Sequence, residues 1–183
     1  MRTNYSKIVK IAETKKETEN IKTFRFKYDK KVKPGQFFMV WVPGIDEIPM
    51  SASYTDSIKG VTVERVGEAT KALFKMKKGD KIGIRGPYGN GFKTPKGKVL
   101  FVAGGTGIIP ITSLIEKIKK KNVIVVFGAK TRNKLFFMSR IKKPLYFFVR
   151  FFVSIMYSIY PLYFLINAMC LFIFLLFSHN NPF

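Results

Sequence analysis

The sequence has only one cysteine, Cys170, and one histidine, His179. A single thiol cannot form a disulfide within the chain or hold a multi-cysteine metal site. A single histidine near the end of the sequence excludes Ser-His-Asp catalysis and a histidine-rich metal site from the rest of the chain. The first residues are charged and include no apolar stretch, so we expect no secretory signal peptide.

Acidic residues are also scarce, and they are unevenly placed. Residues 1–143 hold all 11 acidic residues and 32 of the 33 basic ones, and beyond them the only formal charge is Arg150. The length of 183 residues allows one large domain or two small ones. The change in composition at Lys143 and Pro144 is therefore the clearest boundary in the sequence.

The net charge of +22 is compatible with two kinds of surface. A basic protein of this kind could bind nucleic acid. The lysines are scattered, however, and aromatic residues are not interleaved with them as base-stacking platforms. We therefore favour a solvated lysine-rich surface and expect no nucleic-acid partner.

The first ninety-odd residues read as short strands separated by turn signals. Strands are expected at 7–13, 21–28, 36–43, 60–66 and 81–87, with one short helix at about 69–76. In the second strand, Phe24, Phe26 and Tyr28 alternate with charged residues. Segment 36–43 is almost continuously apolar, which predicts a strand covered on both faces. The spacing favours a small antiparallel barrel.

A different pattern follows the barrel. An apolar strand at 98–104, a helix over 110–120 and an apolar strand at 122–130 predict a β-α-β unit with parallel strands. Residues 132–143 should form the next helix. The fold class is thus a β barrel plus a partial α/β domain, followed by an apolar helical tail. The corresponding domains are 1–95, 96–143 and 144–183.

The turn between the first of these strands and its helix is rich in glycine. Gly104, Gly105 and Gly107 leave no Cβ on the approach side, so a ligand can reach the backbone amides. Pro110 suits the first helical turn, and a helix start favours an anion such as phosphate. The turn is not the usual dinucleotide fingerprint or a P-loop. A tight turn without a ligand remains the alternative.

Several motifs, in order, resemble the ferredoxin reductase-like flavoproteins, in which a flavin-binding barrel precedes a nicotinamide-binding domain. The matching phrases are "IPMSAS", "GEAT", "GPYGNGF", "VAGGTGIIP" and "FGAKT". Within that family, "DEIPMSAS" and "GPYGNGF" are most similar to archaeal electron transfer subunits of the dihydroorotate dehydrogenase B type. The resemblance implies FAD, NAD(P) as redox substrate and a catalytic dehydrogenase subunit as partner in a hetero-oligomer. Subunits of a hydrogenase or of a ferredoxin:NADP oxidoreductase share these motifs and remain alternatives.

The resemblance also assigns roles to particular residues. Those expected along the flavin are Pro49, Met50 and Ser51; those facing its phosphates are Gly67, Ala69 and Thr70; those facing the nicotinamide nucleotide are Gly104, Gly105, Thr106 and Gly107. Hydride passes between nicotinamide C4 and flavin N5, which needs no general base and suits a body without histidine. The structural alternatives are an edge-strand turn at Pro49–Ser51 and an ordinary helix-start hydroxyl at Thr70.

Three features depart from the family. Ile48 stands where an arginine usually clamps phosphate. The [2Fe–2S] centre that the family implies needs four thiolates, and this chain offers only Cys170. The nicotinamide domain is expected to end after about two strands, which removes much of the nucleotide pocket.

The apolar tail has three competing interpretations. Residues 161–177 carry no charge and approach the ~20 residues that cross a bilayer, so 144–178 could anchor the protein at the cytoplasmic face of a membrane. A reading-frame slip after about residue 143 would also yield such a composition, leaving a truncated, non-functional fragment. The third interpretation is that the tail forms a buried helix of a soluble protein. Without an anchor, the expected location is cytoplasmic.

Overall fold

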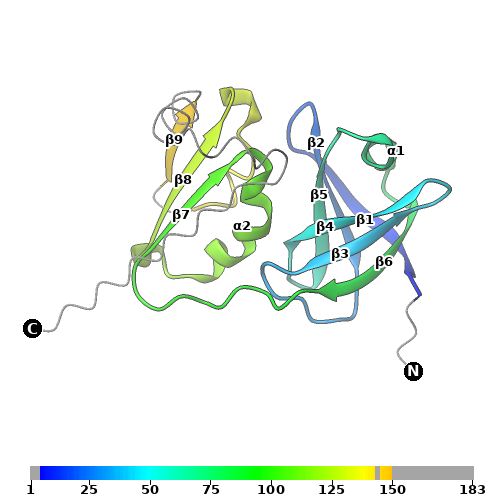
Figure 1. The fold of residues 1–183 in the computed structure, drawn as a ribbon, viewed down its shortest axis with the longest axis horizontal. Coiled ribbons are helices and arrows are strands. Elements are labelled where there is room, and N and C mark those ends of the chain that lie inside the picture. The colour runs from blue at the N-terminus through cyan, green and yellow to red at the C-terminus, as the bar shows by residue number, and fades with distance from the viewer. Residues whose placement is uncertain (1–4, 143–144, 150–183) are drawn as a thin grey trace, which may run out of the picture. The chain divides into compact units, whose positions relative to one another are not determined.

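The computed structural model describes residues 5–142 and 145–149 of the chain (Figure 1). They fall into two compact units. The first comprises residues up to Lys93 together with Ile109–Leu114, and the second comprises Thr94–Ile108 and the residues from Ile115 onward.

The first unit is a closed antiparallel barrel with strand order β1-β2-β5-β4-β3-β6. Its elements are β1 (Lys7–Lys16), β2 (Ile21–Lys27), β3 (Phe37–Val42), β4 (Asp46–Tyr54), β5 (Ile58–Glu64), α1 (Glu68–Lys75) and β6 (Lys81–Tyr88). The predicted barrel and its short helix are confirmed. Strand β4 was not predicted, because Pro49 interrupts the pattern and its polar residues give no clear alternation.

Aromatic side chains fill the barrel. Phe24, Phe26 and Phe38 are fully buried, and the rings of Phe26 and Phe38 meet edge to face with centroids 5.7 Å apart. The expectation that 36–43 is covered on both faces is wrong. Along β3 buried and more accessible residues alternate, and Trp41 is 37% exposed, because a barrel strand has one inner and one outer face.

The second unit contains a parallel sheet with order β7-β8-β9. The elements that follow the barrel strands along the chain are β7 (Val99–Gly104), η1 (Gly105–Gly107), α2 (Ile108–Lys117), η2 (Lys120–Asn122), β8 (Val123–Ala129), η3 (Arg132–Lys134) and β9 (Leu145–Val149). Of these, Ile109–Leu114 of α2 group with the first unit. The predicted β-α-β unit is confirmed as β7-α2-β8, with Pro110 in the first turn of α2.

The helix predicted over 132–143 is wrong. Only η3 forms there, and Phe137 has φ +62°, which no α-helix accommodates. Phe136 and Phe137 are each 2% exposed, and their ring centroids lie 4.9 Å apart. Packing of two adjacent aromatic rings into the core requires an irregular backbone, and it overrides the helical periodicity of the sequence.

The first described residues of the predicted apolar helical tail form a strand instead of a helix. Leu145–Val149 form β9, which pairs in parallel with β8 from Val125↔Leu145 to Ala129↔Val149. The sheet therefore continues past the compositional boundary, and the described part has three strands rather than two. The predicted span at 161–177 and Cys170 lie outside the described residues. Within the described residues, no helix combines the length and apolarity needed to cross a membrane.

Candidate functional site: two glycine-lined anion cradles

A cavity of about 350 Å³ opens on the barrel beside the start of α1. Strand β4 pairs with β3 along Asp46–Ser51, but it pairs with β5 only from Ala52 onward. The first half of β4 thus leaves β5, and the chain from β5 into α1 forms the opposite wall. The lining residues are Ile45, Asp46, Ile48, Val66, Gly67, Glu68, Ala69 and Thr70.

The start of α1 gives this cavity a backbone anion cradle. The first N–H groups of a helix have no partner within it, and the helix dipole is positive there. A Cβ built at Gly67, which precedes α1, would meet nothing within 4 Å, so the approach to these amides is open. Ala69 is 8% exposed and adds only a methyl group. The cradle suits a phosphate group.

Thr70 already has a structural role in the cradle. Its Oγ1 donates to the Gly67 carbonyl at 2.9 Å and accepts from the N–H groups of Val66 and Gly67 at 3.0 and 2.9 Å. These contacts form a capping arrangement that fixes the first turn. An anion here would therefore meet backbone amides, and the hydroxyl would keep those amides in place.

The walls of this cavity carry no basic side chain among the described lining residues, whereas Asp46 and Glu68 are both acidic. Nearby Arg85 is held by Glu47: its Nε donates to Glu47 Oε1 at 3.0 Å, and its Nη2 bonds Oε2. The hydrogen bonds from Arg85 lower the pKa of the Glu47 carboxyl. Ile48 lines the wall of this cavity and carries no charge, so the only groups on these walls suited to an anion are backbone amides.

The three residues expected along a flavin point in different directions. Met50 is 7% exposed and belongs to the barrel core, so only its backbone faces outward. Pro49 is exposed and Ser51 half-buried, both on the outer face. Ser51 of β4 pairs with Phe37 of β3, and Phe37 pairs with Tyr88 of β6. The ring centroids of Phe37 and Tyr88 lie 5.6 Å apart. Sequence reasoning named neither aromatic ring, although "GPYGNGF" contains Tyr88.

The second cradle lies at the carboxyl end of β7. Gly104 ends the strand, and Gly105 follows with φ +51°, a conformation that favours glycine. A Cβ at Gly104, Gly105 or Gly107 would meet nothing within 4 Å. Gly104 and Gly105 are exposed, Thr106 is half-buried and Gly107 is buried. Because α2 begins directly afterwards, with no acid in its first turn, the turn also suits an anion.

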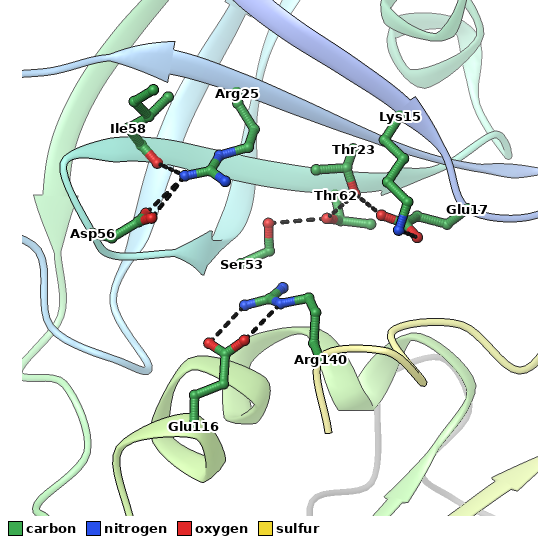
Figure 2. Close-up of polar contacts among 10 residues, drawn as sticks. All are labelled: Lys15, Glu17, Thr23, Arg25, Ser53, Asp56, Ile58, Thr62, Glu116 and Arg140. Carbon is green, nitrogen blue, oxygen red and sulfur yellow. Dashed lines mark hydrogen bonds and ion pairs between the residues drawn. The ribbon is translucent and has the colours of Figure 1, made fainter. Parts of the chain in front are cut away.

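A chain of buried hydroxyls links three strands of the barrel (Figure 2). Ser53 and Thr62 lie 2.9 Å apart, Thr62 and Thr23 2.8 Å, and Thr23 donates to Glu17 at 2.9 Å. Thr62 donates to Ser53, Thr23 donates to Glu17, and the Thr62 and Thr23 hydroxyls are in hydrogen-bond contact with each other. The chain links β4, β5 and β2 and ends on the Glu17–Lys15 ion pair.

The described residues contain no cluster of three or more histidine, cysteine or acidic side chains able to hold a metal ion. Cys170, the one thiol in the sequence, lies outside them. A four-thiolate [2Fe–2S] site therefore does not fit this chain.

Solved structures with the same arrangement are ferredoxin reductases and their relatives. An NADH-dependent reduced ferredoxin-NADP oxidoreductase superposes with a TM-score of 0.67 at 27% identity, covering 78% of this chain and 56% of that protein. Ferredoxin-NADP⁺ reductase from Plasmodium falciparum, at 15% identity, shares the fold with a TM-score of 0.67, covering 81% of this chain and 76% of that protein. No protein-family model matches the chain. The barrel and the β-α-β unit therefore share the fold of ferredoxin-NADP reductase-like proteins.

Sequence similarity is more specific. The chain is 47% identical over 128 residues to a dihydroorotate dehydrogenase B (NAD⁺) electron transfer subunit from Methanocella arvoryzae, covering 68% of this chain and 48% of the relative. The subunit of the same name from Pyrococcus horikoshii is 46% identical over 127 residues, covering 69% and 50%. The chain thus spans about half the length of the curated relatives it matches.

Proposed function

We propose that this chain is an electron transfer flavoprotein subunit. It would pass electrons between a nicotinamide nucleotide and a partner dehydrogenase through FAD, as part of dihydroorotate dehydrogenase B in pyrimidine biosynthesis. The identity of 47% to a subunit of that name carries the proposal. The two open backbone cradles, one in each unit, support it because both cofactors contain pyrophosphates.

In this proposal the backbone of Gly67 and Ala69 binds the FAD phosphates, and Thr70 holds the first turn of α1 in shape. Pro49 and Ser51 present the outer face of β4 to the flavin ring. The turn from Gly104 to Gly107 binds the nicotinamide nucleotide. Bound FAD would supply the acceptor for a hydride. The protein's part is to position the two cofactors and to exclude water from them, because hydride transfer itself needs no general base.

The test uses Gly67, where a side chain has room and φ is −106°. Gly67→Asp supplies a good helix N-cap, so folding should be kept, but it puts a negative charge into the phosphate cradle. Gly67→Asn has nearly the same shape without the charge. We expect the Asp variant to bind FAD roughly tenfold or more weakly than the Asn variant, as titrated by flavin fluorescence. Equal affinities, or no uptake of FAD by the parent chain, would remove the proposal.

A second experiment separates the partner dehydrogenase from its main alternative. The 27% identity to a reduced ferredoxin-NADP oxidoreductase favours ferredoxin as the alternative electron partner. The FAD-loaded chain is mixed with NADH or NADPH, and flavin bleaching is followed at its visible absorbance. Bleaching followed by reoxidation with the dihydroorotate dehydrogenase catalytic subunit supports the first assignment. Reoxidation by ferredoxin alone supports the second, and flavin uptake without bleaching indicates a fragment that binds but does not react.

A further inference from the structure

A second, larger groove lies on the barrel and shares no residue with the flavin cradle. Its volume is about 940 Å³, and its walls come from the first half of β1, the end of β2, the start of β5 and the turn before β6. The lining residues are Lys7, Ile8, Val9, Lys10, Ile11, Ala12, Lys27, Tyr28, Asp29, Ser57, Ile58, Lys78 and Gly79. Nothing in the proposed redox chemistry uses it.

The charges around this groove are unbalanced. It is lined by four lysines and one acidic residue, Asp29, which is already paired with Lys7 at 3.0 Å. Among the described residues, the ammonium groups of Lys10, Lys27 and Lys78 have no carboxylate partner within 4.0 Å. Like charges gathered at one groove repel one another, and an anionic ligand would relieve that repulsion.

The groove also offers a strand edge and an apolar contact. The pairing of β1 with β2 ends at Ile11, whereas Lys7–Lys10 pair only with β6. The N–H and C=O of Ile11 both bond towards the β6 side, at Asp80 and Gly79. Because these groups alternate along an antiparallel strand, those of Ile8 point to the other edge, into the groove. The Ile8 side chain is 51% exposed.

We propose that this groove binds an extended acidic segment of a partner protein. Carboxylates of the segment would pair with Lys10, Lys27 and Lys78, its backbone would bond to the open edge of β1, and an apolar side chain would lie on Ile8. Strand addition of this kind obtains affinity from main-chain hydrogen bonds and specificity from alternate side chains. The inference does not depend on the flavin assignment, because it uses none of the same residues.

The experiment measures binding of a fluorescein-labelled peptide, Asp-Val-Glu-Ile-Asp-Val-Glu, to the full chain by anisotropy. We expect saturable binding that weakens as salt is added. A peptide with Asn and Gln in place of its acids should bind roughly tenfold or more weakly. The triple variant Lys10→Gln, Lys27→Gln, Lys78→Gln should lose a similar factor. A matched triple variant at the exposed lysines 31, 75 and 93, outside the groove, should keep parent affinity.

A structural readout distinguishes the groove from general charge attraction. The Ile8 amide should exchange rapidly with solvent in the free chain and become protected when the acidic peptide is added, whereas Val9 should be protected in both states. Ile8 that is already protected without peptide, or equal losses in the two triple variants, would overturn the proposal. So would tighter binding of an oligothymidylate with the same dependence on the three lysines, since the groove would then be a nucleic-acid site.

Discussion

At the residue scale, buried hydroxyl groups contribute to the stability of the barrel. The hydroxyls of Ser53, Thr62 and Thr23 are nearly or fully buried, and hydrogen-bond contacts join Thr62 to both of the others. Thr62 is the middle member and therefore serves two neighbours. Its loss leaves two buried polar groups without that partner.

We expect Thr62→Val to lower the free energy of unfolding by about 1–3 kcal/mol, because valine keeps the shape but removes both contacts. Urea denaturation followed by circular dichroism measures the change. Thr94→Val, at an exposed threonine, is the control and should stay within about 0.5 kcal/mol of the parent. A Thr62 variant as stable as the control would show that the hydroxyl chain contributes nothing net.

Ile48 is a second single residue at the proposed flavin site. It lines a cavity whose described lining residues include two carboxylates and no cation. Introducing Ile48→Arg should tighten FAD binding by roughly ten- to a hundredfold, since a charged hydrogen bond to phosphate contributes about 1.5–3 kcal/mol. Ile48→Gln, of similar length but neutral, is the control. Equal FAD affinity in the two variants would mean that the phosphates lie elsewhere.

At the scale of elements, β9 is a strand that the composition of the sequence does not identify. Its residues, Leu145–Val149, are part of the apolar stretch that suggested a membrane helix or a frame slip, yet they pair with β8 in regular parallel register. Strands of parallel sheets commonly read as continuous apolar runs, and such a run cannot be told from a helix segment by its pattern alone.

A chain ending at Val149 should therefore retain β8 as a central strand, whereas one ending at Lys142 should expose it as an edge. Hydrogen exchange over residues 123–129 should be faster in the shorter chain, because the amides directed at β9 lose their acceptors. Peptides from β2, in the barrel, should exchange equally in both and serve as the internal reference. Equal exchange over 123–129 would show that β9 does not protect β8.

At the scale of the whole molecule, the net charge of +22 is the dominant physical fact. A compact body with that excess repels itself, and salt screens the repulsion over roughly 8–10 Å at about 0.1–0.15 M. We therefore expect the melting temperature to rise as sodium chloride is added from low ionic strength.

The control for this effect is a chain with less charge to screen. Replacing exposed Lys93 and Lys96 by glutamate removes four units of positive charge, and its melting temperature should respond less steeply to the same salt series. A parent chain whose melting temperature is insensitive to salt would show that its charges are already separated by more than the screening length.

The sequence by itself determined the inner face of the barrel and the glycine turn. Alternation at Phe24 and Phe26, and the shift to helical spacing after Gly107, are local signals that need no partner to be read. The family motifs also predict where phosphates would bind, since a backbone cradle requires small residues at fixed positions along the chain. These phosphate sites stay predictions.

Tertiary structure alone decided the rest, because it depends on which segments become neighbours. The cavity forms where β4 leaves β5, and no local pattern specifies that parting. Phe136 and Phe137 lie in a segment whose sequence predicts a helix, but their two rings pack against each other on an irregular backbone. The lysine groove likewise gathers Lys10, Lys27 and Lys78 from three distant segments, and their mutual repulsion exists only once the barrel has closed.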